Sequence, residues 1–334
     1  MARRILSILG LILAGLVIAG VTVWGALVLF YLAPGGASVR TALAWIFAAI
    51  GLVTIAGLVV RRVRWPAFVA FAAGLVLVVV AWNSVKPSND RDWQTEVAVL
   101  PYATINGDLV TVHNIRNFDY RTETDFTPAY YDRTFDLRRL DRVDLMASYW
   151  MGPNIAHIFL SFGFGDDHLP MSIEVRKTRS KEYSTLQGFF RQYELYYVVG
   201  DERDVVRVRT NYRKSPPEQV YMFRVRGPIE NGRRVFLDYI RDINLLKTQP
   251  RFYNTLTTNC TTMIFAHTTV NAGHIPLSWK ILVTGHLPEY VYEQGRFDRD
   301  LPFEELKRLG HINERAQRAD KSLDFSRLIR VGVP

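Results

Sequence analysis

The sequence predicts an α-helical membrane anchor followed by an α+β domain. Two observations carry this prediction. The long apolar runs lie in the first 85 residues, and the remainder of the 334-residue chain has strand-like segments first and helix-like segments last. Strands and helices in separate runs are typical of α+β domains. We therefore expect an anchor at residues 1–86 and a second domain at residues 87–334, a division that the chain length permits.

Three apolar runs in the anchor are each long enough to cross a bilayer. Residues 5–32, 41–60 and 65–82 contain no charged side chain. A membrane helix needs about 20 apolar residues, with a range of about 17 to 25. Trp65 and Trp82 at the ends of the third run suit the membrane interface. The first run is too long for the apolar core of a cleavable signal peptide.

The formal charge of +9 does not indicate a nucleic-acid surface. Residues 1–66 carry six arginines and no acid, which leaves +3 for the other 268 residues. Five of these arginines precede the first span or join the second to the third, at positions 3, 4, 61, 62 and 64, and the loop between the first two spans has only Arg40. Positive loops stay in the cytoplasm. We expect a cytoplasmic N-terminus, an outer domain after Trp82, a lipid bilayer as partner and no nucleic acid.

The outer domain begins with a polar linker and strand-like segments. Pro87 marks the linker, and Asn106-Gly107 between β-branched residues predicts a hairpin. Further strands are predicted at 143–150, 157–164, 169–177, 193–199, 205–210 and 220–226, and the turn sequence GDDH separates the second of these from the third. The arginines at 203, 207, 209 and 213 are expected on a solvated strand face.

After residue 226 the apolar period changes from strand-like to helix-like. Apolar residues recur every three or four positions from Phe236 to Leu246 and predict an amphipathic helix that ends before Pro250. A second helix is predicted from Cys260 to about residue 270, and a third segment, 301–318, is also helix-like.

Cys260 is the only cysteine of the chain. Asn259 or Thr258 before it can cap a helix, which would set Cys260 in the first turn. There the helix dipole and the free N–H groups favour a thiolate and can stabilise an oxyanion. A lone thiol outside the cytoplasm is a liability unless it is used or buried. The alternative is a small buried side chain without chemistry.

A thiolate nucleophile needs a histidine base within hydrogen-bond reach. His267 lies two helical turns from Cys260, about 10.5 Å along the axis, so we expect it to be structural. His157 begins a predicted strand, and Glu174 on the next strand can face it and orient the imidazole. The sequence does not determine the register of this hairpin, so Ser172 and His168 remain alternatives for the third member.

A resemblance joins these features. The order of a strand histidine, a polar residue on the next strand and a later helix opened by "NC" resembles the circularly permuted papain-like thiol enzymes of the NlpC/P60 and lecithin:retinol acyltransferase groups. The segments IAHIFLSFGF, SIEVRK, FRQYELYYVVGDERD, RTNYR and FYNTLTTNCTT resemble the Lnb N-terminal periplasmic domain family. The resemblance covers roughly residues 108–309 and leaves the three spans outside.

The resemblance implies a lipoprotein N-acyltransferase of the bacterial inner membrane, with a permuted papain-like periplasmic domain. Cys260 would be the nucleophile, His157 the base and Glu174 the third member. The implied partners are a phospholipid acyl donor and a lipoprotein acceptor. We expect no cofactor and no metal, and we interpret Asp166, Asp167 and His168 as a turn.

Two other functions compete with acyl transfer. A cell-wall peptidase or amidase of the NlpC/P60 type uses a similar fold and would need an open polar groove. A membrane-anchored binding module would retain the fold without catalysis. An acyltransferase would instead need apolar space for the chain that it transfers.

Overall fold

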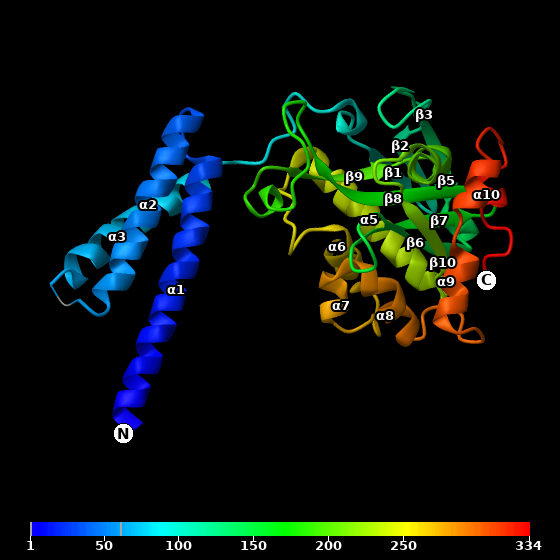
Figure 1. The fold of residues 1–334 in the computed structure, drawn as a ribbon. Helices are drawn as coiled ribbons and strands as arrows, with labels where there is room; N and C mark the ends of the chain where they lie inside the picture. Colours follow the sequence, from blue (N-terminus) through cyan, green and yellow to red (C-terminus); the bar gives the residue numbers. More distant parts are fainter. Residues whose placement is uncertain (1, 61) are drawn as a thin grey trace. The chain divides into compact units, whose positions relative to one another are not determined.

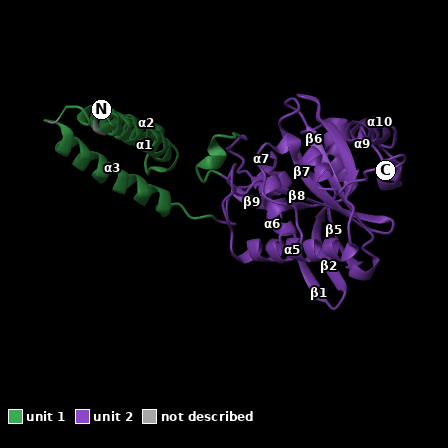
Figure 2. Cartoon of the chain, turned by 90° about the horizontal axis from the view of Figure 1, so that it is seen from below, with its two compact units in different colours: residues 1–87, 184–192 green, residues 88–183, 193–334 purple. Residues whose placement is uncertain are grey.

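The structure, a computed structural model, describes residues 2–60 and 62–334, without the side chain of residue 3. Arg61 and the side chain of Arg3, both used to predict the membrane orientation, therefore lie outside the described residues. The chain forms two compact units (Figure 2). Unit 1 comprises Met1–Pro87 and Ser184–Gln192, and unit 2 comprises Ser88–Tyr183 and Tyr193–Pro334.

Unit 1 contains the predicted membrane helices. They are α1 (Ala2–Leu32), α2 (Ala37–Gly57) and α3 (Arg64–Ser84). Within the described residues, three helices are long and apolar enough to span a bilayer, which confirms the predicted spans. Helices α1 and α2 approach closely at Gly51, where a Cβ atom would lie 2.2 Å from the Thr22 hydroxyl oxygen. Small residues at such contacts are typical of membrane helix pairs.

A short segment from the second half of the chain belongs to unit 1. In Ser184–Gln192, the Phe190 ring stacks on Tyr31 near the end of α1, with ring centres 5.4 Å apart. The Arg191 guanidinium donates to the Trp82 carbonyl oxygen at 2.6 Å and lies 4.3 Å from the centre of its ring. An aromatic stack and a cation–π contact therefore hold this segment against α1 and α3.

Unit 2 is built on antiparallel sheets, as the sequence predicts for an α+β domain. Its central sheet has the order β10-β6-β7-β8-β9, a second sheet has the order β1-β2-β5, and β3 pairs with β4. The strands are β1 (Tyr102–Asn106), β2 (Leu109–Arg116), β3 (Asp119–Tyr120), β4 (Phe126–Thr127), β5 (Tyr130–Asp136), β6 (Arg142–Tyr149), β7 (Ala156–Phe164), β8 (Asp167–Arg176), β9 (Glu194–Val199) and β10 (Gln219–Arg224).

Most predicted strands are confirmed, and one is wrong. The hairpin at Asn106-Gly107 joins β1 to β2, and Gly107 has φ +59°, which suits glycine. Residues 205–210, predicted as a strand, lie instead in helix α4 (Glu202–Arg207) and a π-helical turn (Val208–Tyr212). Asp201 caps α4 by accepting from the Arg203 N–H, and this cap, followed by acids in the first turn, overrides the β-branched composition.

The later part of unit 2 is helical, as predicted. The amphipathic segment is α5 (Ile229–Thr248), and α6 (Cys260–Thr268) begins at the cysteine. The remaining helices are α7 (Trp279–Leu282), α8 (Leu287–Glu293), α9 (Phe303–Gly310), α10 (Asn313–Arg318) and α11 (Phe325–Leu328). Helix α7 contacts both α6 and α8, and the three lie together in Figure 1.

Each face of the central sheet is covered by its own core. Side chains alternate between the faces along a strand. On β7, Ile158 and Leu160 pack into the core that includes α5 and α6, whereas Phe159 packs into the core of α4, α10 and α11. His157 has the same parity as Phe159 and stacks on it, with ring centres 6.0 Å apart. His157 therefore lies on the α4 face, at the end of the strand where α6 begins.

Candidate active site

The structure brings the three predicted site residues together. Cys260 is the first residue of α6, His157 is the second residue of β7 and Glu174 lies near the end of β8. The imidazole Nε2 of His157 is 3.0 Å from Glu174 Oε1, and the Cys260 thiol is hydrogen-bonded to the same ring. Nucleophile, base and carboxylate thus form one chain of contacts within unit 2.

Ser172, one alternative for the third member, also belongs to this cluster. Its Oγ is 2.6 Å from His157 Nε2 and donates to Glu174 Oε1 at 2.7 Å. With Nε2 engaged by these two residues, Nδ1 is the ring nitrogen that remains for the thiol. Ser172 therefore helps to set the orientation of the ring, while Glu174 supplies the charge.

The register of the β7–β8 hairpin explains why Glu174 is near and His168 is not. The two strands pair Leu160 with Met171, and continuing this register by three residues sets His157 opposite Glu174. His168 pairs with Gly163, six residues along β7 from His157, or about 20 Å at the rise of a strand. His168 therefore lies apart from His157, whereas Glu174 and Ser172 contact it.

A capping box sets the position of the cysteine. The Asn259 side chain accepts from the Thr262 backbone N–H at 2.9 Å, and the Thr262 hydroxyl accepts from the Asn259 backbone N–H at 3.0 Å. This confirms Asn259 as the helix cap and leaves the first N–H groups of α6, at Cys260 and Thr261, without partners inside the helix. Cys260 is buried at this end, where the helix dipole favours negative charge.

The two ionisable partners of the thiol stabilise each other's charged forms. Burial alone would lower the pKa of His157, but the charge of Glu174 and the hydrogen bonds from Cys260 and Glu174 raise it to about 9. Burial alone would raise the pKa of Glu174, yet His157, Arg209 and Ser172 hold it well below its usual value. At neutral pH, the site therefore holds an imidazolium beside a carboxylate.

Arg209 is a site residue that the sequence did not reveal. It was expected on a solvated strand face, but it is buried in the π-helical turn. Its guanidinium donates to Glu174 Oε1 and to the Val205 carbonyl oxygen, both at 2.7 Å, and lies 5.1 Å from the centre of the Phe159 ring. π-Helical turns often mark functional sites, and this one aims a cation at the carboxylate that orients His157.

The other arginines of this segment also differ from the prediction. Arg207 is buried and pairs with Asp119, and Arg213 donates to Glu218 at 2.5 Å. Glu218 accepts in turn from Ser148, which pairs with His157 across β6 and β7. The acids at positions 201, 202 and 204, which precede these arginines, indicate a helix start, and this signal identifies the segment as helical from the sequence.

His267 has the structural role that the helix spacing predicts. It is buried, with Nδ1 2.8 Å from Asp238 on α5 and Nε2 2.7 Å from the Tyr197 hydroxyl on β9. Burial lowers the pKa of His267 despite the hydrogen bond to Asp238. These contacts attach α6 to α5 and to the sheet, and they hold the helix that carries Cys260.

The predicted turn at GDDH is confirmed as a turn. It joins β7 to β8, where Asp167 forms an ion pair with Arg133 and His168 Nδ1 lies 3.1 Å from the Asp166 carbonyl oxygen. No group of three or more acids, histidines or cysteines among residues 2–60 and 62–334 could hold a metal ion.

Cys260, His157 and Glu174 open into a cavity of about 410 Å³ within unit 2. Its walls carry both charged and aromatic side chains. They include Glu96, Arg116, Trp150, Lys177, Tyr183, Arg213, Glu218 and Tyr253. Apolar side chains such as Val97, Ile173 and Val198 line it as well. The reaction cavity therefore offers charged groups of both signs beside apolar surface, and it can hold both polar and apolar parts of a substrate.

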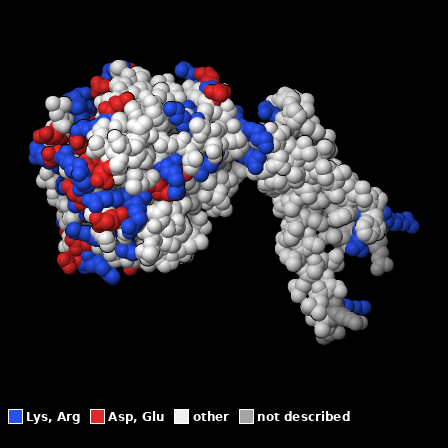
Figure 3. Space-filling model, turned by 180° about the vertical axis from the view of Figure 1, so that it is seen from behind, with Lys and Arg blue, Asp and Glu red and all other residues white. Residues whose placement is uncertain are grey.

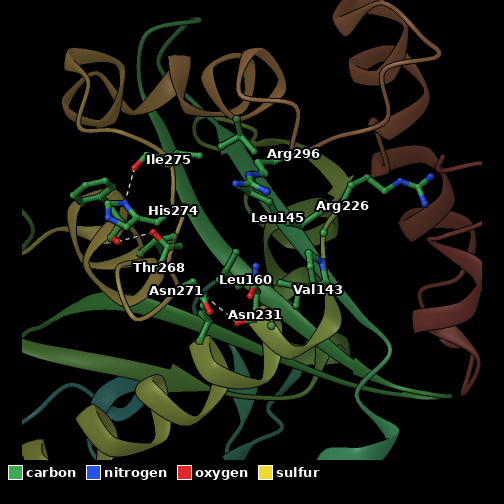
Figure 4. A pocket seen from close by; sticks show the side chains of 18 of the residues that line it. Val143, Leu145, Leu160, Arg226, Asn231, Thr268, Asn271, His274, Ile275 and Arg296 are labelled. Atoms are coloured by element: carbon green, nitrogen blue, oxygen red, sulfur yellow. Dashed lines mark hydrogen bonds between the residues drawn. The ribbon is translucent and has the colours of Figure 1, made fainter.

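A second cavity, of about 220 Å³, is mostly apolar (Figure 4). Leu145 and Leu160 line it from the sheet, and Ile275 lines it from the segment after α6 (Figure 4). Thr261, the residue after Cys260, is also part of its wall. An apolar cavity of about 150 Å³ is known to hold a benzene molecule, so this one has room for a longer apolar group.

One family model matches the part of the chain that contains this site. Residues 126–285 match the family model described as the Lnb N-terminal periplasmic domain. The matched range includes Cys260, His157 and Glu174, and it leaves α1, α2 and α3 outside. No curated protein and no solved structure matches the chain.

Proposed function

We propose that this chain, which carries an Lnb N-terminal periplasmic domain over residues 126–285, is a membrane-bound thiol acyltransferase acting on lipoproteins. The observation that carries the proposal is the contact chain from Cys260 through His157 to Glu174. An activated thiolate nucleophile with an oriented base is the arrangement that covalent acyl transfer requires. No residue of the site needs a cofactor for this chemistry.

In the first half-reaction, the Cys260 thiolate attacks the carbonyl carbon of a phospholipid ester. The ester C–O bond breaks, the His157 imidazolium donates its proton to the departing lysophospholipid oxygen, and an S-acyl enzyme forms. The N–H groups at the start of α6 lie beside the sulfur and can stabilise the oxyanion of the tetrahedral intermediate. Glu174 and Arg209 hold the imidazole in place throughout.

In the second half-reaction, the α-amine of a diacylglyceryl-cysteine attacks the thioester carbon. His157, now neutral, accepts a proton from the amine, the C–S bond breaks and the thiolate returns beside the imidazolium. The product is an N-acylated lipoprotein. The two substrates react in turn, so ping-pong kinetics are expected.

Three features support lipid as the substrate class. The chain has three helices able to cross a membrane, and only residues 85–87 separate the end of α3 from unit 2. Three residues span at most about 11 Å, so the covalent linker from the last membrane helix to unit 2 is short. The apolar cavity beside Thr261 provides space for an acyl chain close to the nucleophile.

The proposed location is a bacterial inner membrane with unit 2 in the periplasm. Among the described arginines, Arg4 lies in the first turn of α1, Arg62 lies between α2 and α3, and Arg64 is the first residue of α3. The positive-inside rule favours the cytoplasmic side for both of these ends. We further propose a permuted papain-like architecture, supported by a strand histidine that precedes a helix-opening cysteine in an antiparallel sheet.

The proposal is tested by the N-terminus of a lipoprotein substrate. The full chain, or its Cys260→Ser variant, is incubated in proteoliposomes with phospholipid and a diacylglyceryl lipoprotein, and the lipoprotein N-terminus is analysed by mass spectrometry. The wild-type chain should add one amide-linked acyl chain, and the variant should add none. An unchanged N-terminus with active, folded wild-type protein would refute lipoprotein acylation.

A periplasmic peptidase or amidase is the second candidate function. The specific observation in its favour is the charged lining of the reaction cavity, which suits a peptide. The discriminating measurement is the muropeptide profile of cells with and without the Cys260→Ser substitution. A change in muropeptides with unaltered lipoproteins would favour the peptidase, and no change in either would favour a binding module.

A further inference from the structure

Unit 2 exposes large apolar side chains close to the nucleophile. We call five of them the apolar rim. They come from the β6–β7 loop and from the segment around α7: Met151 (64% exposed), Ile155 (42%), Leu277 (73%), Trp279 (60%) and Leu282 (47%). A solitary exposed apolar side chain needs no explanation, but a group of them marks an interaction surface.

The two parts of the rim are joined by hydrogen bonds. The Gly285 N–H donates to the Asn154 carbonyl oxygen at 3.0 Å, and the Ala156 N–H donates to the Thr284 hydroxyl at 2.9 Å. The side chain of His286 contacts Asn154 at 2.8 Å, and its ring lies 5.6 Å from that of Trp279. The β6–β7 loop and the α7 segment are thus one continuous surface.

The apolar rim is also attached to the catalytic elements. The β6–β7 loop leads directly into His157, and Trp150, the neighbour of Met151, lines the reaction cavity. On the other side, the Thr261 hydroxyl donates to the Ile281 carbonyl oxygen at 2.6 Å, which joins the start of α6 to α7. The rim is therefore attached both to the strand that carries His157 and to the helix that carries Cys260.

Unit 2 is covalently joined to the membrane helices by short connections. Unit 2 follows α3 after three residues. The chain also returns to the membrane helices at Ser184, directly after Tyr183, a residue of the reaction cavity. The chain therefore passes between the two units at three points, 87/88, 183/184 and 192/193, and the second of these follows a residue of the cavity wall.

We infer that the apolar rim inserts into the outer interface of the bilayer that α1, α2 and α3 cross, so that a phospholipid ester enters the reaction cavity directly from the membrane. Tryptophan beside leucine, isoleucine and methionine is the composition of interfacial membrane contacts. Figure 3 shows Lys and Arg beside Asp and Glu over much of one face of unit 2, a pattern suited to water, whereas the five rim residues carry no charge. Only one part of the inference rests on the proposed function, namely that the group entering the cavity is a phospholipid ester.

The single cysteine permits a direct test in the full chain. On a Cys260→Ser background, Leu277→Cys is labelled with an environment-sensitive fluorophore, and the protein is reconstituted into phosphatidylethanolamine–phosphatidylglycerol liposomes. The matched control is Leu323→Cys on the same background, because Leu323 is 86% exposed on unit 2 and is not part of the rim. Nitroxide-bearing lipids then quench any label that lies in the bilayer.

The label at position 277 should emit at shorter wavelength and be quenched several-fold more strongly than the label at 323. Equal emission and equal quenching at the two positions would overturn the inference, and Trp279→Cys repeats the test at a second position. Since these chains lack the nucleophile, the result is independent of catalysis. Failure of the proposed function would leave it unchanged.

A kinetic measurement adds to this test. The double variant Leu277→Ser and Trp279→Ser should lose most of its acylation by bilayer phospholipid and keep its reaction with a water-soluble short-chain ester. An equal loss with both donors would contradict a role confined to membrane contact.

Discussion

The two cavities near the start of α6 differ in volume and in the side chains that line them. The cavity that holds Cys260 has about 410 Å³ and carries acids and bases, whereas the cavity at Thr261 has about 220 Å³ and is mostly apolar. Successive residues of a helix point about 100° apart. Cys260 and Thr261, in the same turn of α6, therefore line different cavities. On the proposed function, bond chemistry and acyl-chain binding are separated by one residue, and each side can be changed alone.

The largest effect after loss of the nucleophile is expected for His157→Gln. Glutamine cannot exchange a proton with the thiol or the amine, so acyl transfer should fall by about 10²- to 10⁴-fold. The loss should be the same for long-chain and short-chain donors, because His157 takes part in breaking and forming bonds and does not bind the acyl chain. Initial rates with both donors measure this, and His168→Gln, at the other end of the hairpin, should retain full activity.

Glu174→Gln should reduce the rate about 100-fold and change its pH dependence. In the wild-type chain, the pKa of His157 is raised from 6.5 to about 9, so its imidazolium form persists to higher pH. The raised pKa of His157 contributes to the free energy of unfolding. This contribution is complete below pH 6.5 and is lost as the pH rises through about 9. Without the Glu174 charge, burial dominates and the pKa of His157 falls.

The alkaline limb of the pH–rate profile should therefore move to lower pH in Glu174→Gln. Glu123→Gln serves as the control, because Glu123 lines the same cavity but pairs with Arg213. If the limb stays in place in Glu174→Gln, the carboxylate does not set the charge state of His157.

Arg209→Lys tests a residue that the sequence did not indicate. Lysine keeps the charge but cannot hold Glu174 and the Val205 carbonyl oxygen with one planar group. Loss of one hydrogen bond to a charged group costs about 1.5 kcal/mol, or roughly tenfold in rate. Arg179→Lys, at an exposed ion pair with Asp92, should show no change in the same rate assay.

The smallest effect, and the one specific to the apolar cavity, is expected for Val225→Phe. Val225 lines that cavity, and the larger ring would occupy part of it. Transfer of long chains should fall a few-fold while transfer of short chains is unchanged. A rate assay over donors of increasing chain length tests this, with Val331→Phe on the exposed surface as the control. An equal loss at every chain length would show that the cavity does not bind the chain.

The sequence predicts the residues around Cys260 better than it predicts the apolar cavity. Cys260 and its cap follow from local signals, since an asparagine before an apolar run indicates a helix start. The strands of His157 and Glu174 were predicted, but their register was left open by the sequence. In the structure a two-residue turn, 165–166, sets that register. These elements are local in sequence, and local patterns predict them.

Arg209 and the apolar cavity depend on contacts between distant segments. The alternation of valine and arginine at 205–210 is strand-like, and the Asp201 cap together with the packing of Val205 and Val206 into the α4 core makes that segment helical. The cavity is formed by strands β6 and β7, helices α5, α6 and α8, and the segment after α6. Such a volume is left by packing and has no sequence pattern of its own.

The measurement that tests the central claim most directly is the intact mass of the protein after exposure to phospholipid without an acceptor. The account predicts that the wild-type chain gains the mass of one acyl group, that hydroxylamine removes it, and that Cys260→Ala never carries it. A wild-type chain that stays unmodified in a phospholipid bilayer, or an adduct that persists in Cys260→Ala, would contradict covalent acyl transfer through Cys260.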